Sequence, residues 1–272
     1  MEGRLQRRVQ RYGWDRAAGH YEALWQAQLA PAREALLAQA AIAPGEAVLD
    51  VACGTGLVTC AAAHAAGAGA RVLGTDLSGE MVRAARRGAA ERGLAQVRFE
   101  RMDAERLQVR DAAFDVALCA LGLMYVADPL CAMQELRRAL RPRGRVALAV
   151  WGERHRCGWA AVFPLVQAEV AGEVCPLFFS LGAQGALAAL CRAAGFIAVG
   201  EQRLRTHLAY ADGAAACAAA FVGGPVALAW SRFDEGVRER LRARYLETLE
   251  PWRSGEGFRV PGEFVVVHAR AP

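Results

Sequence analysis

Short apolar runs alternate with apolar positions at helical spacing between about residue 44 and residue 151. The runs predict strands over 47–51, 71–75, 96–101, 114–120 and 145–151, and the spaced positions predict helices over 57–66, 79–92 and 128–140. Regular alternation of strand and helix at this spacing is typical of a parallel, doubly wound sheet. We therefore expect an α/β fold.

The pattern changes on both sides of this region. Residues 14–41 predict one or two helices, with Pro31 as a break, and residues 152–183 are irregular. A helix is expected over 184–194, a strand over 196–204, helices over 212–250 and a last strand over 263–269. Because no linker divides the chain, we expect an N-terminal helical cap over 1–43 and one domain over 44–272, with cap insertions at about 152–183 and 209–256.

All 33 basic side chains are arginine, and the formal net charge is +5. The absence of lysine excludes a P-loop, a pyridoxal-phosphate Schiff base and the Tyr-x-x-x-Lys pair of short-chain dehydrogenases. The weak positive charge leaves no electrostatic footprint for nucleic acid, so no nucleic-acid partner is expected.

No run of about 18 apolar residues and no apolar signal segment is present, so we expect neither a membrane span nor secretion, and a cytoplasmic location. The eight cysteines contain no C-x-x-C pair, and the five histidines are not clustered. We therefore expect reduced cysteines and no metal site.

A Gly-x-Gly turn, Gly54-Thr55-Gly56, follows the first strand and opens a helix. Asp50 lies four residues before it, where a pyrophosphate would be repelled but an ammonium group attracted. Thr59 stands where a dinucleotide fingerprint requires a small residue, and Asp76 ends the next strand, where an acid accepts hydrogen bonds from ribose hydroxyls. A ribose and a cationic amino-acid end without a pyrophosphate describe S-adenosylmethionine.

These segments resemble those of class I S-adenosylmethionine-dependent methyltransferases. LDVACGTG at 49–56 resembles motif I, with Ala52 where many members have glycine, and GTDLS at 74–78 resembles motif II. RMDAE at 101–105, FDVA at 114–117 and LRRALRPRG at 136–144 match the later motifs, and WDRAAGHYE at 14–22 is similar to the start of the UbiE/COQ5-like (methyltransferase type 11) branch. The resemblance implies a Rossmann-like sheet of about seven strands, mostly parallel with an antiparallel last strand, and S-adenosyl-L-methionine as cofactor.

The resemblance also implies roles for single residues. It places the methionine end of the cofactor on the motif I turn, the ribose on Asp76, and the adenine on Leu77 with Asp103 and Ala104 at its edge. The full predicted cofactor set is Tyr21, Asp50, Ala52, Cys53, Gly54, Gly56, Asp76, Leu77, Met81, Asp103, Ala104, Ala120 and Leu121. His20 and His155, which fall in segments expected near the site, are the candidates for a general base.

The methyl acceptor is expected to be a small, partly apolar molecule, methylated at carbon or oxygen as in the UbiE-like branch, such as a quinone-like compound or a secondary metabolite. DNA methyltransferases are disfavoured, because CALGLMY at 119–125 has no Pro-Pro pair and the chain has no Pro-Cys. The cap aromatics either line an acceptor pocket or form the core of the cap: Trp159, Phe163, Phe178, Phe179, Phe221, Trp230 and Phe233.

Two alternatives remain open. One is a methyltransferase-like protein that binds the cofactor without catalysis or acts as a partner subunit. The other is a nicotinamide-dependent oxidoreductase, which Asp50, Thr59 and the missing lysine disfavour. The sequence does not determine the oligomeric state.

Overall fold

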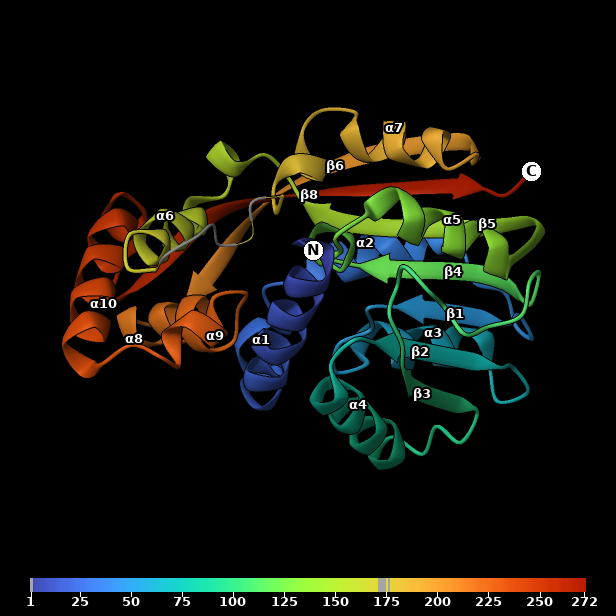
Figure 1. Ribbon diagram of the computed structural model, residues 1–272, viewed down its shortest axis with the longest axis horizontal. Helices are drawn as coiled ribbons and strands as arrows, with labels where there is room; N and C mark the ends of the chain where they lie inside the picture. Colours follow the sequence, from blue (N-terminus) through green and yellow to red (C-terminus); the bar gives the residue numbers. More distant parts are fainter. Residues whose placement is uncertain (1, 171–174, 176) are drawn as a thin grey trace.

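A single sheet organises the computed structural model, which describes residues 2–170, 175 and 177–272. The strand order is β3-β2-β1-β4-β5-β8-β6, and β7 pairs with β8 off this path. β1 to β5 pair in parallel, and β8 runs antiparallel to both β5 and β6 (Figure 1). The strands are β1 Val48–Val51, β2 Val72–Asp76, β3 Val97–Arg101, β4 Phe114–Ala120, β5 Leu140–Trp151, β6 Ile197–Tyr210, β7 Arg253–Ser254 and β8 Gly257–Arg270. This arrangement confirms the expected Rossmann-like sheet with its antiparallel last strand.

Helices pack on the sheet and form the segments around it. The longer ones are α1 Glu2–Trp25, α2 Ala30–Ala40, α3 Leu57–Ala66, α4 Gly79–Glu91, α5 Pro129–Ala139, α7 Ala186–Ala193 and α10 Glu235–Leu249. Shorter ones are α6 Val162–Gln167, α8 Gly213–Cys217, α9 Ala227–Trp230, the π-helical η5 Ala218–Val222, and the 3-10 turns η1 Leu123–Tyr125, η2 Arg154–Arg156, η3 Gly158–Ala161, η4 Ser180–Gly182 and η6 Glu250–Trp252. No helix in the described part of the chain is both long and apolar enough to cross a membrane.

Side-chain caps start two of the helices that pack on the sheet, α4 and α5. The Ser78 hydroxyl accepts from the Met81 amide at 3.1 Å and begins α4, and Asp128 caps α5, with Pro129 in its first turn. α1 differs from expectation, because it begins at Glu2 rather than near residue 14. Its N-terminal half is rich in arginine but packs one face on the protein, so tertiary contact decides its length.

β6 and β8 extend further than their sequences predicted. Their last pairs, from Arg205↔Glu263 to Tyr210↔Phe258, lie beyond the end of β5, whose pairing with β8 stops at Trp151↔Phe264. The two strands therefore continue as a two-stranded arm that carries residues 211–256 away from the sheet (Figure 1). α1 contacts α4 on one side and α9 on the other, so it bridges the sheet region and this arm.

The aromatic residues of the cap form two clusters. In the arm, Phe221 stacks on Trp230 at 4.4 Å and meets Tyr245 edge-on at 5.4 Å. In the segment after β5, Trp159 packs with Phe163, Phe178 and Phe179. Residues 171–174 and 176 of the expected insertion over 152–183 lie outside the described residues.

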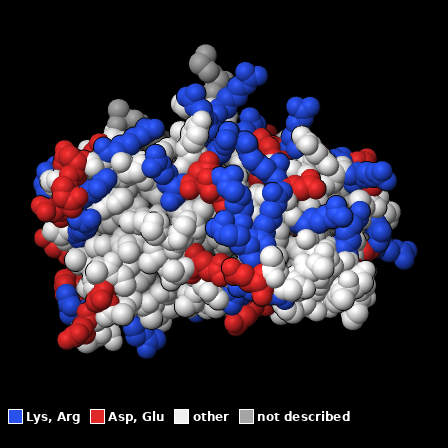
Figure 2. Space-filling view, turned by 90° about the horizontal axis from the view of Figure 1, so that it is seen from below, with Lys and Arg blue, Asp and Glu red and all other residues white. Residues whose placement is uncertain are grey.

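Charges are mixed on the face seen from below. Figure 2 shows arginines interspersed with acidic side chains across its middle, with uncharged areas on both sides. This face is therefore not a uniformly basic surface.

Candidate active site

Two adjoining cavities lie at the carboxyl ends of the parallel strands, where doubly wound sheets bind their ligands. The larger has an empty volume of about 960 Å³ and the smaller about 510 Å³. They share six lining residues: Tyr21, Leu29, Ala52, Gly54, Ala120 and Leu121. The shared wall makes them parts of one site.

The turn between β1 and α3 lies between the two cavities. Ala52, Gly54 and Gly56 all have positive φ, at 56°, 56° and 83°. A side chain at Gly54 would meet only the Tyr21 ring, at 3.9 Å, so the backbone there is open to a ligand. A side chain at Gly56 would meet Phe99 Cζ at 2.9 Å, so this glycine instead lets α3 and β3 pack closely.

Asp50 is completely buried in β1 and lines the smaller cavity. Its Oδ2 accepts a hydrogen bond from the Thr59 hydroxyl at 2.6 Å, whereas its Oδ1 has no partner. Burial raises the pKa of Asp50 to about 7, although the Thr59 hydrogen bond acts in the opposite direction. A buried carboxylate with one free oxygen is a site for a ligand cation or donor.

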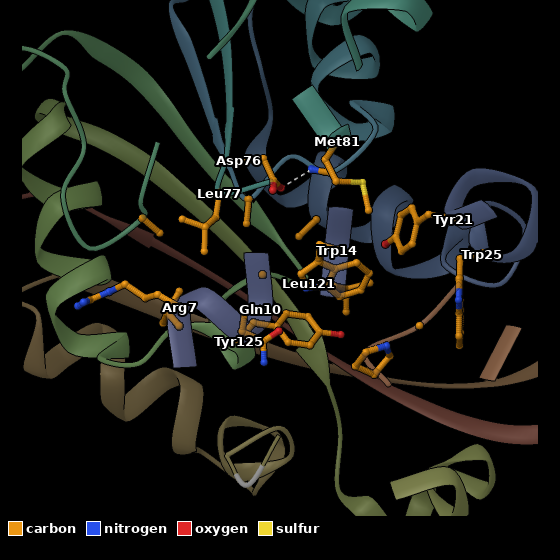
Figure 3. Close-up of a pocket in the computed structure, with 18 of the residues that line it drawn as sticks. Arg7, Gln10, Trp14, Tyr21, Trp25, Asp76, Leu77, Met81, Leu121 and Tyr125 are labelled. Atoms are coloured by element: carbon orange, nitrogen blue, oxygen red, sulfur yellow. Dashed lines mark hydrogen bonds between the residues drawn. The ribbon is translucent and has the colours of Figure 1, made fainter. Parts of the chain in front are cut away.

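Asp76 ends β2 and lines the larger cavity. Its two oxygens accept backbone hydrogen bonds. Oδ2 accepts from Gly54 N at 2.9 Å (Figure 3), and Oδ1 accepts from Ser78 N at 2.8 Å. Burial raises the pKa of Asp76 to about 6 against these two bonds. The carboxylate therefore joins the glycine turn to the start of α4.

α1 supplies one wall of the larger cavity through one helical face. Its lining residues recur every three, four or seven positions: Arg7, Gln10, Trp14, Tyr21 and Trp25 (Figure 3). Arg7 holds this wall to the segment after β3, with its Nη2 at 2.5 Å from Glu105 Oε2 and its Nε at 3.1 Å from Asp103 Oδ2. Asp15, further along α1, accepts from the Ser78 hydroxyl at 2.6 Å.

The far part of the larger cavity is aromatic. Trp14 meets Tyr21 and Tyr125 edge-on, at 5.6 and 5.0 Å between ring centroids. Trp159 contacts Trp25 at 5.8 Å and Trp151 at 4.8 Å. The indole nitrogens of Trp25 and Trp159 are buried and have no hydrogen-bond partner.

Known proteins are similar in sequence to the segment that carries the glycine turn, Asp50 and Asp76. A family model described as a methyltransferase domain matches residues 48–144. Nocamycin O-methyltransferase of Saccharothrix syringae is 34% identical over 203 residues, which cover 69% of this chain and 72% of that protein. The chain belongs to the S-adenosylmethionine-dependent methyltransferases.

Other relatives match this methyltransferase over a shorter span. An uncharacterised protein of Mycobacterium tuberculosis is 36% identical over 135 residues, covering 50% of this chain and 48% of that protein. The ubiquinone/menaquinone C-methyltransferase UbiE of Bdellovibrio bacteriovorus is 38% identical over 121 residues, covering 44% and 51%. The chain thus spans about half the length of these curated relatives.

Solved structures share the fold of the methyltransferase at low identity. The [4+2]-cyclase SpnF aligns with a TM-score of 0.59 and 23% identity, over 93% of this chain and 84% of that one. A SAM-dependent methyltransferase of Aquifex aeolicus aligns with a TM-score of 0.54 and 16% identity, over 88% and 89%. At these identities the likeness concerns the fold alone.

The structure brings twelve of the thirteen predicted cofactor residues to the two cavities. The larger is lined by Tyr21, Ala52, Gly54, Asp76, Leu77, Met81, Asp103, Ala104, Ala120 and Leu121, and the smaller adds Asp50 and Cys53. Gly56 lines neither cavity, and its close approach to Phe99 indicates a packing role, so its contact with the methionine end stays a prediction.

The two histidines expected as general-base candidates lie elsewhere. His20 is exposed on α1, and His155 is exposed with its Nε2 at 3.7 Å from Glu153 Oε2. No described histidine of the methyltransferase lines either cavity, so the geometry gives neither residue support as a general base.

Sequence reasoning also missed part of the wall. Arg7, Gln10, Trp14 and Trp25 line the cavity, and of the seven cap aromatics only Trp159 does so. The spacing of polar and aromatic positions along α1 was the available signal, but a helix face gives no indication of what it covers.

Proposed function

We propose that this protein transfers a methyl group from S-adenosylmethionine to a small, largely apolar molecule. The observation that carries the proposal is a pair of buried carboxylates, Asp50 and Asp76, on either side of the open backbone at Gly54. The free Oδ1 of Asp50 suits an ammonium group, and Asp76 has lone pairs left for hydroxyl groups of a ribose.

The remaining predicted residues fit the rest of such a cofactor. Leu77, Asp103 and Ala104 would surround the adenine, and Tyr21, Ala120 and Leu121 would enclose the methionine chain. We assign residues 44–272 to the cofactor-binding domain and residues 1–43 to a helical cap over it. When bound, the cofactor supplies a methyl group already activated by its sulfonium charge. The chain's own contribution is alignment and the exclusion of water by α1 and the aromatic wall.

Both oxygen and carbon acceptors have support among the relatives. The nocamycin enzyme is named an O-methyltransferase and UbiE a C-methyltransferase. The longer match with the former favours methylation at oxygen.

Calorimetry tests the cofactor assignment. Wild-type protein is titrated with S-adenosylhomocysteine, NAD and NADP, together with Asp76→Ala and the exposed control Glu91→Ala. We expect micromolar binding of S-adenosylhomocysteine alone, a loss of at least tenfold in affinity in Asp76→Ala, and no change in the control. Binding of NAD or NADP, with no binding of S-adenosylhomocysteine, would contradict the proposal and favour a nicotinamide-dependent oxidoreductase.

A turnover assay must follow, because the fold also occurs in a protein named a cyclase. Production of S-adenosylhomocysteine from S-adenosylmethionine, dependent on an added acceptor, would support methyl transfer. Cofactor binding without turnover on any phenol, quinol, acid or amine would favour the non-catalytic alternative.

A further inference from the structure

The lining of the larger cavity is rich in hydrogen-bond donors beyond the cofactor turn. The hydroxyl groups of Tyr21 and Tyr125 point into the cavity from opposite sides (Figure 3). Hydroxyl donors that face a cavity favour a ligand that accepts hydrogen bonds there.

The carboxylates of the same lining are paired within the protein or, for the remaining lone pairs of Asp76, assigned to the cofactor ribose. The titratable side chains of this lining among the described residues are Arg7, Tyr21, Asp76, Asp103, Glu105 and Tyr125. Asp103 and Glu105 pair with Arg7, and Glu105 also accepts from the amides of Ala127 and Asp128. Asp76 is bound by two backbone amides.

The two tyrosines do not fill the role of a base. Burial is the main cause that raises the pKa of Tyr21, and it raises that of Tyr125 well above the ordinary value. Both hydroxyls therefore stay protonated at neutral pH and act as donors.

We propose that the methyl acceptor is an apolar molecule whose reacting oxygen is already an anion at neutral pH, as in a carboxylate or an acidic enol. This inference rests on the proposed function and specifies its substrate class. An aliphatic alcohol or a protonated amine must lose a proton during reaction, and the described lining of the larger cavity offers no free group to take it. The free Oδ1 of Asp50 lies in the adjoining cavity and is assigned to the ammonium group of the cofactor.

The proton and electron balance agrees with this substrate class. A lone pair of the acceptor oxyanion forms the O–C bond as the C–S bond breaks, and the electron pair of that bond goes to sulfur. The negative charge of the acceptor and the positive charge of the sulfonium disappear together. The products are a neutral ester or enol ether and a neutral thioether, and no proton is released.

Binding of probe molecules to protein saturated with S-adenosylhomocysteine tests the proposal without turnover. The probes share a flat apolar body: 2-naphthoate and 4-hydroxycoumarin represent the carboxylate and the acidic enol, and 2-naphthamide and 2-naphthylmethylamine represent the neutral and cationic cases. At pH 7.5 we expect at least one anion to bind tenfold or more tighter than the amide and the amine. If 2-naphthoate binds more tightly than 4-hydroxycoumarin, the preferred acceptor is a carboxylate; if 4-hydroxycoumarin binds more tightly, it is an acidic enol.

Two further measurements separate recognition of the anion from apolar packing. Tyr125→Phe removes one donor hydroxyl and should reduce the preference for the anion about fivefold or more, whereas Tyr12→Phe, which loses an exposed hydroxyl on α1, should not. Binding enthalpies of the anion should agree in phosphate and Tris buffers, because no proton is taken up.

Equal affinity for anion and amide, tighter binding of the amine, or no binding of any probe would overturn the inference. A binding enthalpy that differs between the buffers, which would show uptake of a proton with the probe, would also overturn it. These outcomes are separate from failure of the proposed function, because S-adenosylhomocysteine binding is measured first and independently.

Discussion

The Thr59 hydroxyl donates to Asp50 Oδ2 at 2.6 Å and leaves Asp50 Oδ1 without a partner. The hydroxyl, carried on the first turns of α3, orients a carboxylate at the base of the glycine turn. A half-satisfied buried carboxylate destabilises the unliganded protein. The same free oxygen is available to a cationic ligand. Asp50 therefore lowers the stability of the unliganded protein and favours binding of the ligand.

Replacing Asp50 by asparagine should stabilise the unliganded protein at alkaline pH. The pKa of Asp50 rises on folding from 3.8 to about 7, so the folded state binds more protons than the unfolded state between these values. Wild-type stability therefore falls as pH rises from about 4 to 7, and the loss is complete above about pH 7. We expect Asp50→Asn to be more stable than wild type by on the order of 2–4 kcal/mol at pH 8 and equal to it near pH 4.

Urea unfolding at the two pH values measures this difference, and Asp115→Asn is the control. Burial acts to raise the pKa of Asp115, but hydrogen bonds from Ala47 N and Arg141 lower it overall. Asp115→Asn should therefore destabilise the protein at pH 8. Destabilisation by Asp50→Asn at pH 8 would contradict the account of Asp50.

Gly56→Ala should destabilise the fold by about 2–4 kcal/mol. The substitution combines a positive φ with a contact to Phe99 at 2.9 Å, and strain and overpacking each cost about 1–3 kcal/mol. Gly67→Ala provides the control, because Gly67 has φ 82° with nothing within 4 Å of the added carbon, and should cost only about 1 kcal/mol. Equal losses in chemical denaturation would show that packing against Phe99 is not the reason for Gly56.

Arg7→Gln should loosen α1 from the cavity. The variant loses the pairs with Asp103 and Glu105 that join α1 to the segment after β3. Arg7 is about one-third exposed, so the loss of stability should be modest, about 1 kcal/mol. We expect faster amide hydrogen exchange in the first half of α1 and severalfold weaker binding of S-adenosylhomocysteine.

Arg8→Gln is the matched control for Arg7, because Arg8 is exposed and no ion pair is found for it within the described residues. It should leave both readouts unchanged. Similar changes in the two variants would mean that overall charge, rather than the specific pair, governs α1.

Glu263→Gln should destabilise the protein by about 3 kcal/mol. The Glu263 side chain is 2% exposed, and its Oε2 accepts from Arg203 Nη2 at 2.6 Å. Burial acts to raise the pKa of Glu263, but the bond from Arg203 and the amide of Glu153 lower it overall. The pair of Glu263 with Arg203 therefore stabilises the fold at pH values above the pKa of Glu263 in the unfolded chain. This stabilisation is lost as the pH falls through the lower pKa of Glu263 in the folded protein.

Thermal unfolding from pH 8 down to about pH 2.5 should show a steeper loss in wild type than in Glu263→Gln below the unfolded pKa of 4.5. Glu250→Gln, which removes an exposed pair with Arg253, should shift the midpoint by less than the buried variant. A larger shift of the unfolding midpoint in Glu250→Gln than in Glu263→Gln would contradict the stabilising role of the buried pair.

The sequence predicted the central region well because its signals are local. β1 to β4 and α3 to α5 end within a few residues of their expected bounds, since apolar runs, caps and turn glycines lie within each segment. Thr59 was read only as a departure from a dinucleotide fingerprint, although it holds Asp50. The pairing of Arg7 with Glu105 and the length of β6 and β8 depend on partners far along the chain, which local patterns do not report.

The two-stranded arm formed by the ends of β6 and β8 separates a segment that can vary in sequence from the strands that face the cofactor. Residues 211–256 lie at its tip and reach the cavity at Gly224 and Pro225, whereas the glycine turn, Asp50 and Asp76 lie on the sheet. Changes of sequence or length in the arm can therefore reshape one edge of the pocket while leaving the cofactor-facing strands intact. Such a layout lets a lineage acquire new acceptors by remodelling a projecting segment, and it makes that segment the first place to exchange when specificity is to be engineered.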